Sequence, residues 1–337
     1  MTGTPDLAIR LDGTIDPGRS AALAAAADRA GFRTVWFAEN PFQRGVLPAA
    51  SASAVATRSI AIGIGVFNPF NRHPSLMAME IAALDELAGG RAILGIGAGV
   101  PSVIGRFAGF ERPVAAMRDS LAILRGMLAG GTVSHAGTVF SADAVSLGFA
   151  PPRRDLPIHV AAMGPRMLHL AGEIGDGVLI SNMCPPGYTA HAAALAAAGA
   201  ASAGRAPPET VVKYMPCAVA ADRASARRAI KPEIAAKLRG YEALFADTPA
   251  ALAAVRHGGA IEPALYAATL ERLRAGEDPD TALDEAFVEL YGIAGTVADC
   301  LRRIGELGAG GASEIALTFV GGDAARDIAL IGEAAGG

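Results

Sequence analysis

The chain is poor in the residues that nucleic-acid surfaces, disulfide frames and membrane spans require. Only three of its 337 residues are lysine and the net charge is −4, so we expect no nucleic-acid partner. The three cysteines (Cys184, Cys217 and Cys300) lie far apart without a CxxC spacing, which argues for a reducing compartment and against a disulfide frame or zinc site. No unbroken apolar run reaches the roughly 18 residues of a membrane span, and the N-terminus lacks the pattern of a signal peptide. We therefore expect a cytoplasmic protein with no membrane or metal partner.

Glycine, in contrast, is abundant, with 41 residues, and it punctuates the stretch 65–99. An apolar run over 59–66 is followed by apolar residues at helical spacing over 73–87 and by a second apolar run over 91–97. Strand, helix and strand within about thirty residues is the length of a right-handed parallel crossover. The GIGAG sequence at 95–99 does not indicate a dinucleotide fold, because the acidic partner expected about 20 residues later would be Asp119, in the middle of a predicted helix.

The same alternation of strand and helix runs along the whole chain. Apolar runs predict eight strands, over 6–11, 34–38, 59–66, 91–97, 157–162, 177–181, 210–220 and 313–319. We expect a loop at 101–113, a short excursion at 135–152 and a helical insertion at 241–290, before the eighth strand. Eight alternating units favour an α/β fold of the (β/α)8 TIM-barrel type over an open doubly wound sheet. We predict a single domain over residues 1–337.

In such a barrel the reactive groups lie at the C-terminal ends of the strands. The segments there are 39–40, 66–70, 97–103, 163–164, 181–184 and 320–323. They hold no paired carboxylates and no lysine, so a lyase or isomerase without a redox cofactor is a weak alternative. A helix that begins after Gly164 would offer free backbone N–H groups to an anion.

Several motifs, in this order, resemble the bacterial luciferase-like superfamily of flavin- and deazaflavin-dependent oxidoreductases. The motifs are NPFNRHP at 68–74, LDELAGGRAILGIGAG at 84–99, PIHVAAMGP at 157–165, GDGVLIS at 175–181 and the segment 295–322. Within the superfamily they are most similar to the coenzyme F-420-dependent branch, typified by methylenetetrahydromethanopterin reductase. The resemblance implies hydride transfer between this deazaflavin and a small organic substrate, on a TIM barrel.

The resemblance also implies a set of site residues. It places a non-prolyl cis peptide at Gly65–Val66, which bulges against one face of the redox ring. The implied catalytic residues are Glu39 and Asn40. The implied cofactor-binding residues are Glu39, Gly65, Val66, Asn68, Gly97, Ala98, Gly99, Met163, Gly164 and Ser181. Arg72 and His73 are interpreted either as ligand-binding residues or, preferably, as a network at the start of the next helix.

Two departures from relatives that oxidise sugar phosphates keep alternatives open. Asn40 stands where those relatives have a histidine, and Val100 stands where they have a glutamate, so their proton donor and acceptor are missing. One alternative, which stays open because FMN and the deazaflavin occupy the same cleft in the superfamily, is an FMN-dependent monooxygenase that uses reduced FMN and oxygen. Another is a relative that binds a cofactor without catalysis. Relatives commonly pair through helices on one side of the barrel, so we expect a homodimer.

Overall fold

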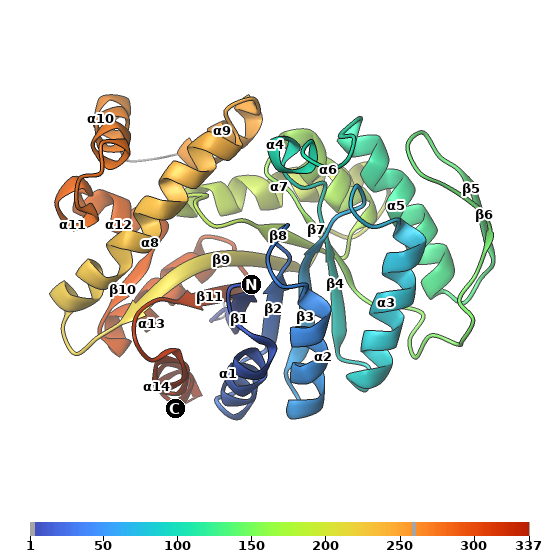
Figure 1. Ribbon diagram of the computed structural model, residues 1–337, viewed down its shortest axis with the longest axis horizontal. Coiled ribbons are helices and arrows are strands. Elements are labelled where there is room, and N and C mark those ends of the chain that lie inside the picture. Colours follow the sequence, from blue (N-terminus) through green and yellow to red (C-terminus); the bar gives the residue numbers. More distant parts are fainter. Residues whose placement is uncertain (1–3, 258–260, 337) are drawn as a thin grey trace.

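The computed structural model describes residues 4–257 and 261–336, and its centre is a closed parallel barrel (Figure 1). The strands follow one another around the ring as β1 (Asp6–Asp12), β2 (Thr34–Ala38), β3 (Ala61–Phe67), β4 (Ala92–Ile96), β7 (Ile158–Ala161), β8 (Gly177–Ile180), β9 (Thr210–Val219) and β11 (Glu314–Phe319). Parallel pairing of β8 with β9, and of β11 with β1, closes the ring. The predicted TIM barrel is confirmed, and every predicted strand lies within two residues of its expected ends.

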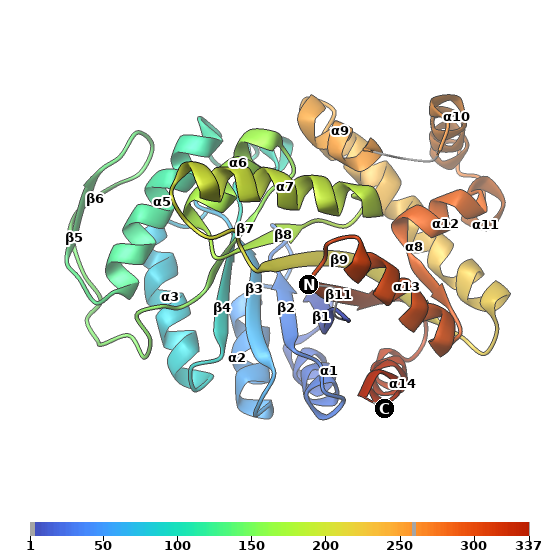
Figure 2. The same ribbon diagram turned by 180° about the vertical axis from the view of Figure 1, so that it is seen from behind.

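Helices cover the outside of the barrel (Figures 1 and 2). They are α1 (Pro17–Arg29), α2 (Val46–Ala56), α3 (Pro74–Leu87), α5 (Pro113–Leu128), α6 (Pro165–Ile174), α7 (Pro186–Ser202), α13 (Val297–Ala309) and α14 (Ala324–Gly336). Alternate strand residues such as Ile9 and Ile62 point outward and are buried in the core that these helices complete. Asp16 begins α1 by accepting a hydrogen bond from the Arg19 N–H at 2.9 Å, ahead of a proline in the first turn, which is the expected start of a helix.

The inside of the barrel holds a smaller cluster of side chains. Its buried members are Ala8, Trp36, Leu179, Val212, Tyr214 and Ala316. Large residues on some strands face glycines on others: a Cβ on Gly63 would lie 2.4 Å from the Trp36 ring. Such a distance is far below van der Waals contact, so the glycines of β3 are required by the large side chains beside them.

Four elements were not expected from the sequence. The excursion at 135–152 contains an antiparallel hairpin, β5 (Val133–Ala136) and β6 (Ser141–Val145), which lies outside the barrel. Asp119 on α5 stabilises this hairpin by accepting the Val139 N–H at 2.7 Å and contacting His135 Nε2 at 3.1 Å. The strand β10 (Ile293–Gly295) pairs with β9 beyond the barrel, and α4 (Pro101–Ile104) lies inside the predicted loop.

The chain between β9 and β10 forms a group of helices, which lies to one side of the barrel (Figure 1). The group is α8 (Arg223–Leu244), α9 (Pro249–Arg256), α10 (Pro263–Arg274), α11 (Pro279–Ala282) and α12 (Glu285–Tyr291). It has a core of its own around Ile230, Ile234, Leu238 and Phe287. Within the described residues, none of the helices is long and apolar enough to cross a bilayer.

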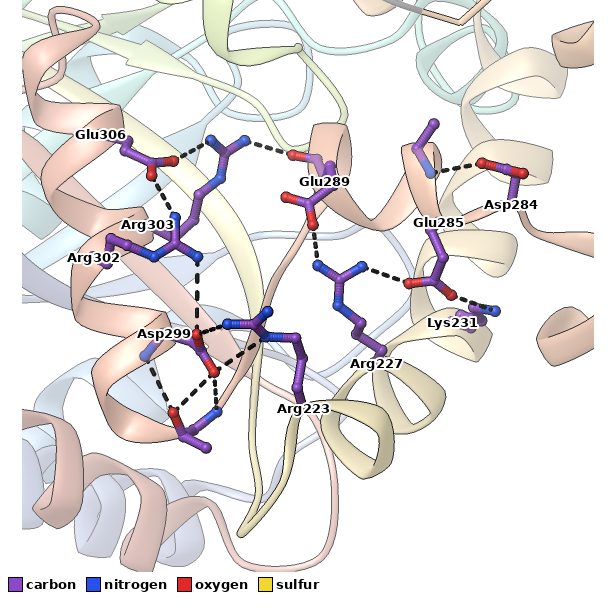
Figure 3. A network of polar contacts seen from close by, with 12 residues as sticks. Arg223, Arg227, Lys231, Asp284, Glu285, Glu289, Asp299, Arg302, Arg303 and Glu306 are labelled. Atoms are coloured by element: carbon purple, nitrogen blue, oxygen red, sulfur yellow. Dashed lines mark hydrogen bonds and ion pairs between the residues drawn. The ribbon is translucent and has the colours of Figure 1, made fainter.

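Ion pairs join this group of helices to α13 (Figure 3). Arg227 on α8 contacts Glu285 at 2.5 Å and also Glu289, both on α12. Arg223 on α8 reaches Asp299 in the first turn of α13. Arg227 and Asp299 are half-buried, but the partner of each is more than half exposed to solvent. Each pair therefore contributes little to stability by itself, and the pairs serve to orient α8 against its neighbours.

Candidate functional site

The bulge at the end of β3 is the central feature of the barrel mouth. The pairing register of β3 with β4 shifts between Ile64 and Phe67, and the Gly65–Val66 peptide bond is cis, at the position where the family resemblance places it. A Cβ on Gly97 would lie 3.0 Å from a Val66 methyl, and one on Gly95 3.2 Å from the other methyl. The glycines that end β4 therefore give clearance to the bulged valine itself.

Asn68 ties the bulge to the end of β4. Its Nδ2 donates to the Ala98 carbonyl at 2.8 Å, and its Oδ1 accepts the Phe70 N–H at 2.8 Å. Gly99 has a φ of +79°, and a Cβ there would lie 2.0 Å from Asn68 Nδ2. The carboxamide is buried and already holds two loop segments together, with one N–H and one lone pair left over for a ligand.

Glu39, at the end of β2, is held by Arg72. The two η nitrogens of Arg72 lie 3.1–3.2 Å from the Glu39 carboxylate, and its Nε lies 2.8 Å from Glu80 Oε2. The guanidinium also stacks over the Phe67 ring at 4.2 Å. Burial, together with the nearby Glu39 charge, raises the pKa of Glu80, although Arg72 opposes this.

The preferred interpretation of Arg72 and His73 as a network at a helix start fits these contacts. His73 begins α3, and its Nδ1 lies 2.7 Å from Ser75 Oγ. Arg72 has both carboxylates as partners. Asn40 lies beside Glu39, where its Nδ2 donates to Gln43 Oε1 at 3.1 Å.

The start of α6 combines several groups at the end of β7. Gly164 begins the helix without a side-chain cap, so the first N–H groups of α6 remain available to an anion. The Tyr188 hydroxyl donates to the Met163 carbonyl at 2.5 Å, and Arg166 in the first turn is exposed. Ala250 of α9 lies close to Gly164, since a Cβ there would be 3.7 Å from the Ala250 Cβ.

Ser181 and Lys213 define the end of β8. The Ser181 hydroxyl lies 2.5 Å from the hydroxyl of Tyr241 on α8. Lys213 is fully buried and donates to the Ser181 carbonyl at 3.1 Å and to the Cys184 carbonyl at 2.5 Å. Burial lowers the pKa of Lys213 to about 8 and raises the pKa of the Cys184 thiol to about 11. Cys184 therefore stays an unreactive thiol at neutral pH.

Sequence reasoning missed a set of polar side chains on the inner wall. Arg10 on β1, Tyr214 on β9 and Thr318 on β11 each have a buried polar atom without a hydrogen-bond partner among the described residues. In the sequence these residues are visible as polar positions in otherwise apolar strands. Which face of a strand points into the barrel is known only from the closed structure, so their position could not be predicted.

Deeper in the barrel, Glu314 and His159 titrate far from their usual ranges. Burial raises the pKa of Glu314 to about 7, although Trp36 Nε1 and Thr34 Oγ1 donate to its carboxylate at 2.6 and 2.9 Å. Burial lowers the pKa of His159 to about 4, so the ring is neutral at pH 7. No group of three or more histidine, cysteine or acidic side chains in the described part of the chain could hold a metal ion.

The groups at the mouth fit an elongated cofactor with a flat ring and an anionic tail. The bulge offers a backbone surface for one ring face, and Asn68 keeps one N–H and one lone pair free for the polar edge of the ring. The uncapped start of α6 lies at the end of β7, two strands from the bulge, and suits the tail.

Comparison with known proteins agrees with this geometry. The family model described as luciferase-like monooxygenase matches residues 4–314. The 5,10-methylenetetrahydromethanopterin reductase of Methanolobus tindarius is 34% identical over 92% of this chain and 93% of its own length. The F420-dependent hydroxymycolic acid dehydrogenase of Mycobacterium tuberculosis is 30% identical over 79% of this chain and 81% of its own. The structure of the coenzyme F420-dependent tetrahydromethanopterin reductase of Methanopyrus kandleri superposes with a TM-score of 0.85, at 27% identity, and 98% of each chain is covered. The chain therefore belongs to the luciferase-like monooxygenase family of TIM-barrel oxidoreductases.

Proposed function

We propose that the protein is an oxidoreductase that transfers a hydride between coenzyme F-420 and a small organic substrate. The similarity to reductases and dehydrogenases, of which two are named for this cofactor, carries the proposal, and the bulge where β3 ends beside the glycines of β4 supports it. When it is bound, the deazaflavin supplies the hydride-carrying carbon. The protein's task is then to orient the ring and the substrate.

We assign the tasks of orientation to the predicted site residues. Gly65, Val66 and the 97–99 segment would support one ring face and leave the other face open to the substrate. Glu39 and Asn68 would contact the polar edge of the ring. Met163 and Gly164 would bind the phosphate, with Ser181 beside the tail. Because Glu39 is an ion-pair acceptor for Arg72, we assign it to binding and orientation and not to proton donation.

We further propose that the chain works as one domain, in which α8–α12 and the 101–113 segment shape the substrate site. Ser102 Oγ donates to the Leu244 carbonyl at 3.0 Å, which joins α4 to the end of α8. Tyr241 of α8 reaches Ser181 at the barrel mouth. Helices outside the barrel therefore contact the ends of its strands, and they are placed to select substrates.

Two further assignments follow from the surface and from the cysteines. We propose a homodimer, because Val55 on α2 and Leu76, Met79 and Leu87 on α3 are apolar side chains that are 45–71% exposed on neighbouring helices. Analytical ultracentrifugation would detect it, and a Leu76→Glu/Met79→Glu variant should sediment as a monomer. The three cysteines are free thiols, which supports a place in the reducing cytoplasm.

A cofactor titration tests the proposed function. Purified protein is titrated with coenzyme F-420 and, separately, with FMN, and the fluorescence of each cofactor reports its dissociation constant. We expect micromolar or tighter binding of F-420 and at least tenfold weaker binding of FMN. The reverse order would favour an FMN-dependent monooxygenase, and binding of F-420 without reduction by any donor in a substrate panel would favour a non-catalytic relative.

A further inference from the structure

Arg10 is a buried cation with an incomplete set of partners. Its side chain is 9% exposed, its Nη1 lies 3.5 Å from Asp12 Oδ2, and its Nε has no partner among the described residues. Thr14 already uses the other Asp12 oxygen, through its N–H at 3.1 Å and its hydroxyl at 2.6 Å. Of the three nitrogens of the guanidinium, Nε is buried without an acceptor, which is unfavourable unless one arrives.

Two hydroxyl groups with no partner among the described residues lie near Arg10. Thr318 is on the adjacent strand β11, and Tyr214 is on β9, one strand further around the barrel. The guanidinium carbon of Arg10 lies 5.6 Å from the centre of the Tyr214 ring. The Tyr214 hydroxyl lies against the bulge, because a Cβ on Gly65 would be 2.2 Å from it. Ala316 pairs with both Ala8 and Tyr214. Arg10 is two residues beyond Ala8 on β1, and Thr318 is two residues beyond Ala316 on β11. The two side chains therefore point into the barrel from adjacent strands, one layer nearer the mouth than Tyr214.

The other acidic side chains of the inner wall already have hydrogen-bond or ion-pair partners. Glu314 lies one layer deeper, where Trp36 and Thr34 donate to it. Glu39, at the rim, is paired with Arg72. Among the described residues, Asp12 is the one carboxylate within ion-pair distance of Arg10. The wall beside the bulge is thus rich in donors and carries a partly uncompensated positive charge.

We propose that Arg10, Tyr214 and Thr318 form a subsite for the oxygen of the substrate's reacting carbonyl group, so that the substrate pair is a carbonyl compound and its alcohol. The assignment rests on the proposed function. Hydride addition to the carbonyl carbon moves the electron pair of the C=O π bond onto the oxygen, while the deazaflavin is oxidised. The Tyr214 hydroxyl then gives its proton to the oxygen and recovers one from solvent. Donors aimed at an oxygen that gains negative charge stabilise the transition state, whereas an iminium substrate would be repelled by the Arg10 charge.

The first experiment measures binding and not turnover. Dissociation constants for F-420 are compared for the native protein, Arg10→Gln, Tyr214→Phe and the matched control Arg274→Gln, which changes an exposed arginine on α10. Acetate, a small oxygen anion, is then titrated at constant ionic strength, with the fluorescence of bound F-420 as the readout. We expect F-420 affinity to stay within twofold in all variants. We expect acetate affinity to fall at least tenfold in Arg10→Gln, several-fold in Tyr214→Phe and not at all in Arg274→Gln.

Two results of this experiment would overturn the assignment. A loss of F-420 affinity in Arg10→Gln would place the arginine against the cofactor's own carbonyl groups. Equal acetate affinity in Arg10→Gln and Arg274→Gln would show that no oxygen subsite exists. If the native protein binds no F-420, the proposed function fails on its own. The acetate titration is then read from the thermal unfolding midpoint of the cofactor-free protein, where the same tenfold difference supports the subsite and its absence refutes it.

A second measurement tests the class of substrate. Reduced F-420 is offered with a panel of small ketones and aldehydes and with a matched panel of cyclic imines. We expect oxidation by the carbonyl panel, with kcat/KM lowered on the order of 100-fold in Arg10→Gln and partly restored in Arg10→Lys. Turnover of imines without turnover of carbonyl compounds would refute the proposal.

Discussion

The contact between Gly99 and Asn68 allows a quantitative test of how the barrel mouth is held together. In Gly99→Ala, the new methyl group would lie 2.0 Å from Asn68 Nδ2, at a backbone φ of +79°. The left-handed backbone alone costs an alanine about 1–2 kcal/mol. Displacing Asn68 also breaks its bonds to the Ala98 carbonyl and the Phe70 N–H, at about 0.5–1.5 kcal/mol each. The total loss of unfolding free energy is therefore about 2–5 kcal/mol.

A matched control separates the two contributions. Gly89 has a φ of +64°, and a Cβ there meets no atom within 4 Å. Gly89→Ala should therefore show the backbone cost alone, about 1–2 kcal/mol. Asn68→Ala should show the lost hydrogen bonds, and Gly99→Ala/Asn68→Ala should cost less than the sum of the two single changes by about 1–3 kcal/mol, because the overlap is gone.

Urea unfolding followed by far-ultraviolet circular dichroism gives each free energy, and the F-420 titration shows whether the mouth keeps its shape. Strict additivity of Gly99→Ala and Asn68→Ala would refute the reasoning, since it would mean that the two residues do not interact. A cost for Gly99→Ala no larger than that for Gly89→Ala would refute it as well.

The remaining predictions concern buried and exposed charges. The pKa of Glu314 is raised from 4.5 to about 7, so between these pH values the unfolded chain has released a proton that the folded chain retains. The free energy of unfolding should therefore fall as pH rises through this window, by at most about 3 kcal/mol. Denaturant unfolding at pH 5, 6 and 7.5 measures this dependence, and Glu314→Gln should remove it. An unchanged dependence on pH in the variant would contradict the raised pKa of Glu314. Arg227→Gln should lower the free energy of unfolding by less than about 1 kcal/mol, and by less still in 0.5 M salt. A large loss that salt does not alter would show that the ion pairs of Figure 3 are stronger than partly exposed pairs usually are. Cys184, fully buried and with its pKa raised to about 11, should resist iodoacetamide at pH 8 in the native protein and react in urea, as mass spectrometry of the peptides would report; rapid native labelling would mean that its loop opens.

The barrel could be predicted because each of its strands is a short apolar run. The hairpin β5–β6 could not, since its two short strands mix small apolar residues with polar ones and are half exposed. It depends on Asp119, which lies 16 residues before His135 along the chain. The three residues of β10 are too few for a periodic pattern. Local patterns therefore define the strands whose apolar residues are buried on both faces, and they miss strands that depend on distant contacts.

The candidate site was predictable only in part. The resemblance located the bulge and the strand ends, but it did not show which side chains were already paired. The partner of Glu39 lies 33 residues away on the next unit, and Arg10 reads as a break in the apolar pattern of its strand. Closure of the barrel is what places Arg10 beside Tyr214, and no local pattern contains that information.

The glycines inside the barrel have a consequence for how such a chain can change over time. Gly63 faces Trp36, Gly65 faces Tyr214 and Gly97 faces Val66. Enlarging one member of such a couple forces overlap, and shrinking the other leaves a void, so either single step is unfavourable. New specificities on this scaffold should therefore arise through compensated exchanges, in which a bulky residue moves from one strand to the other and the total volume is preserved.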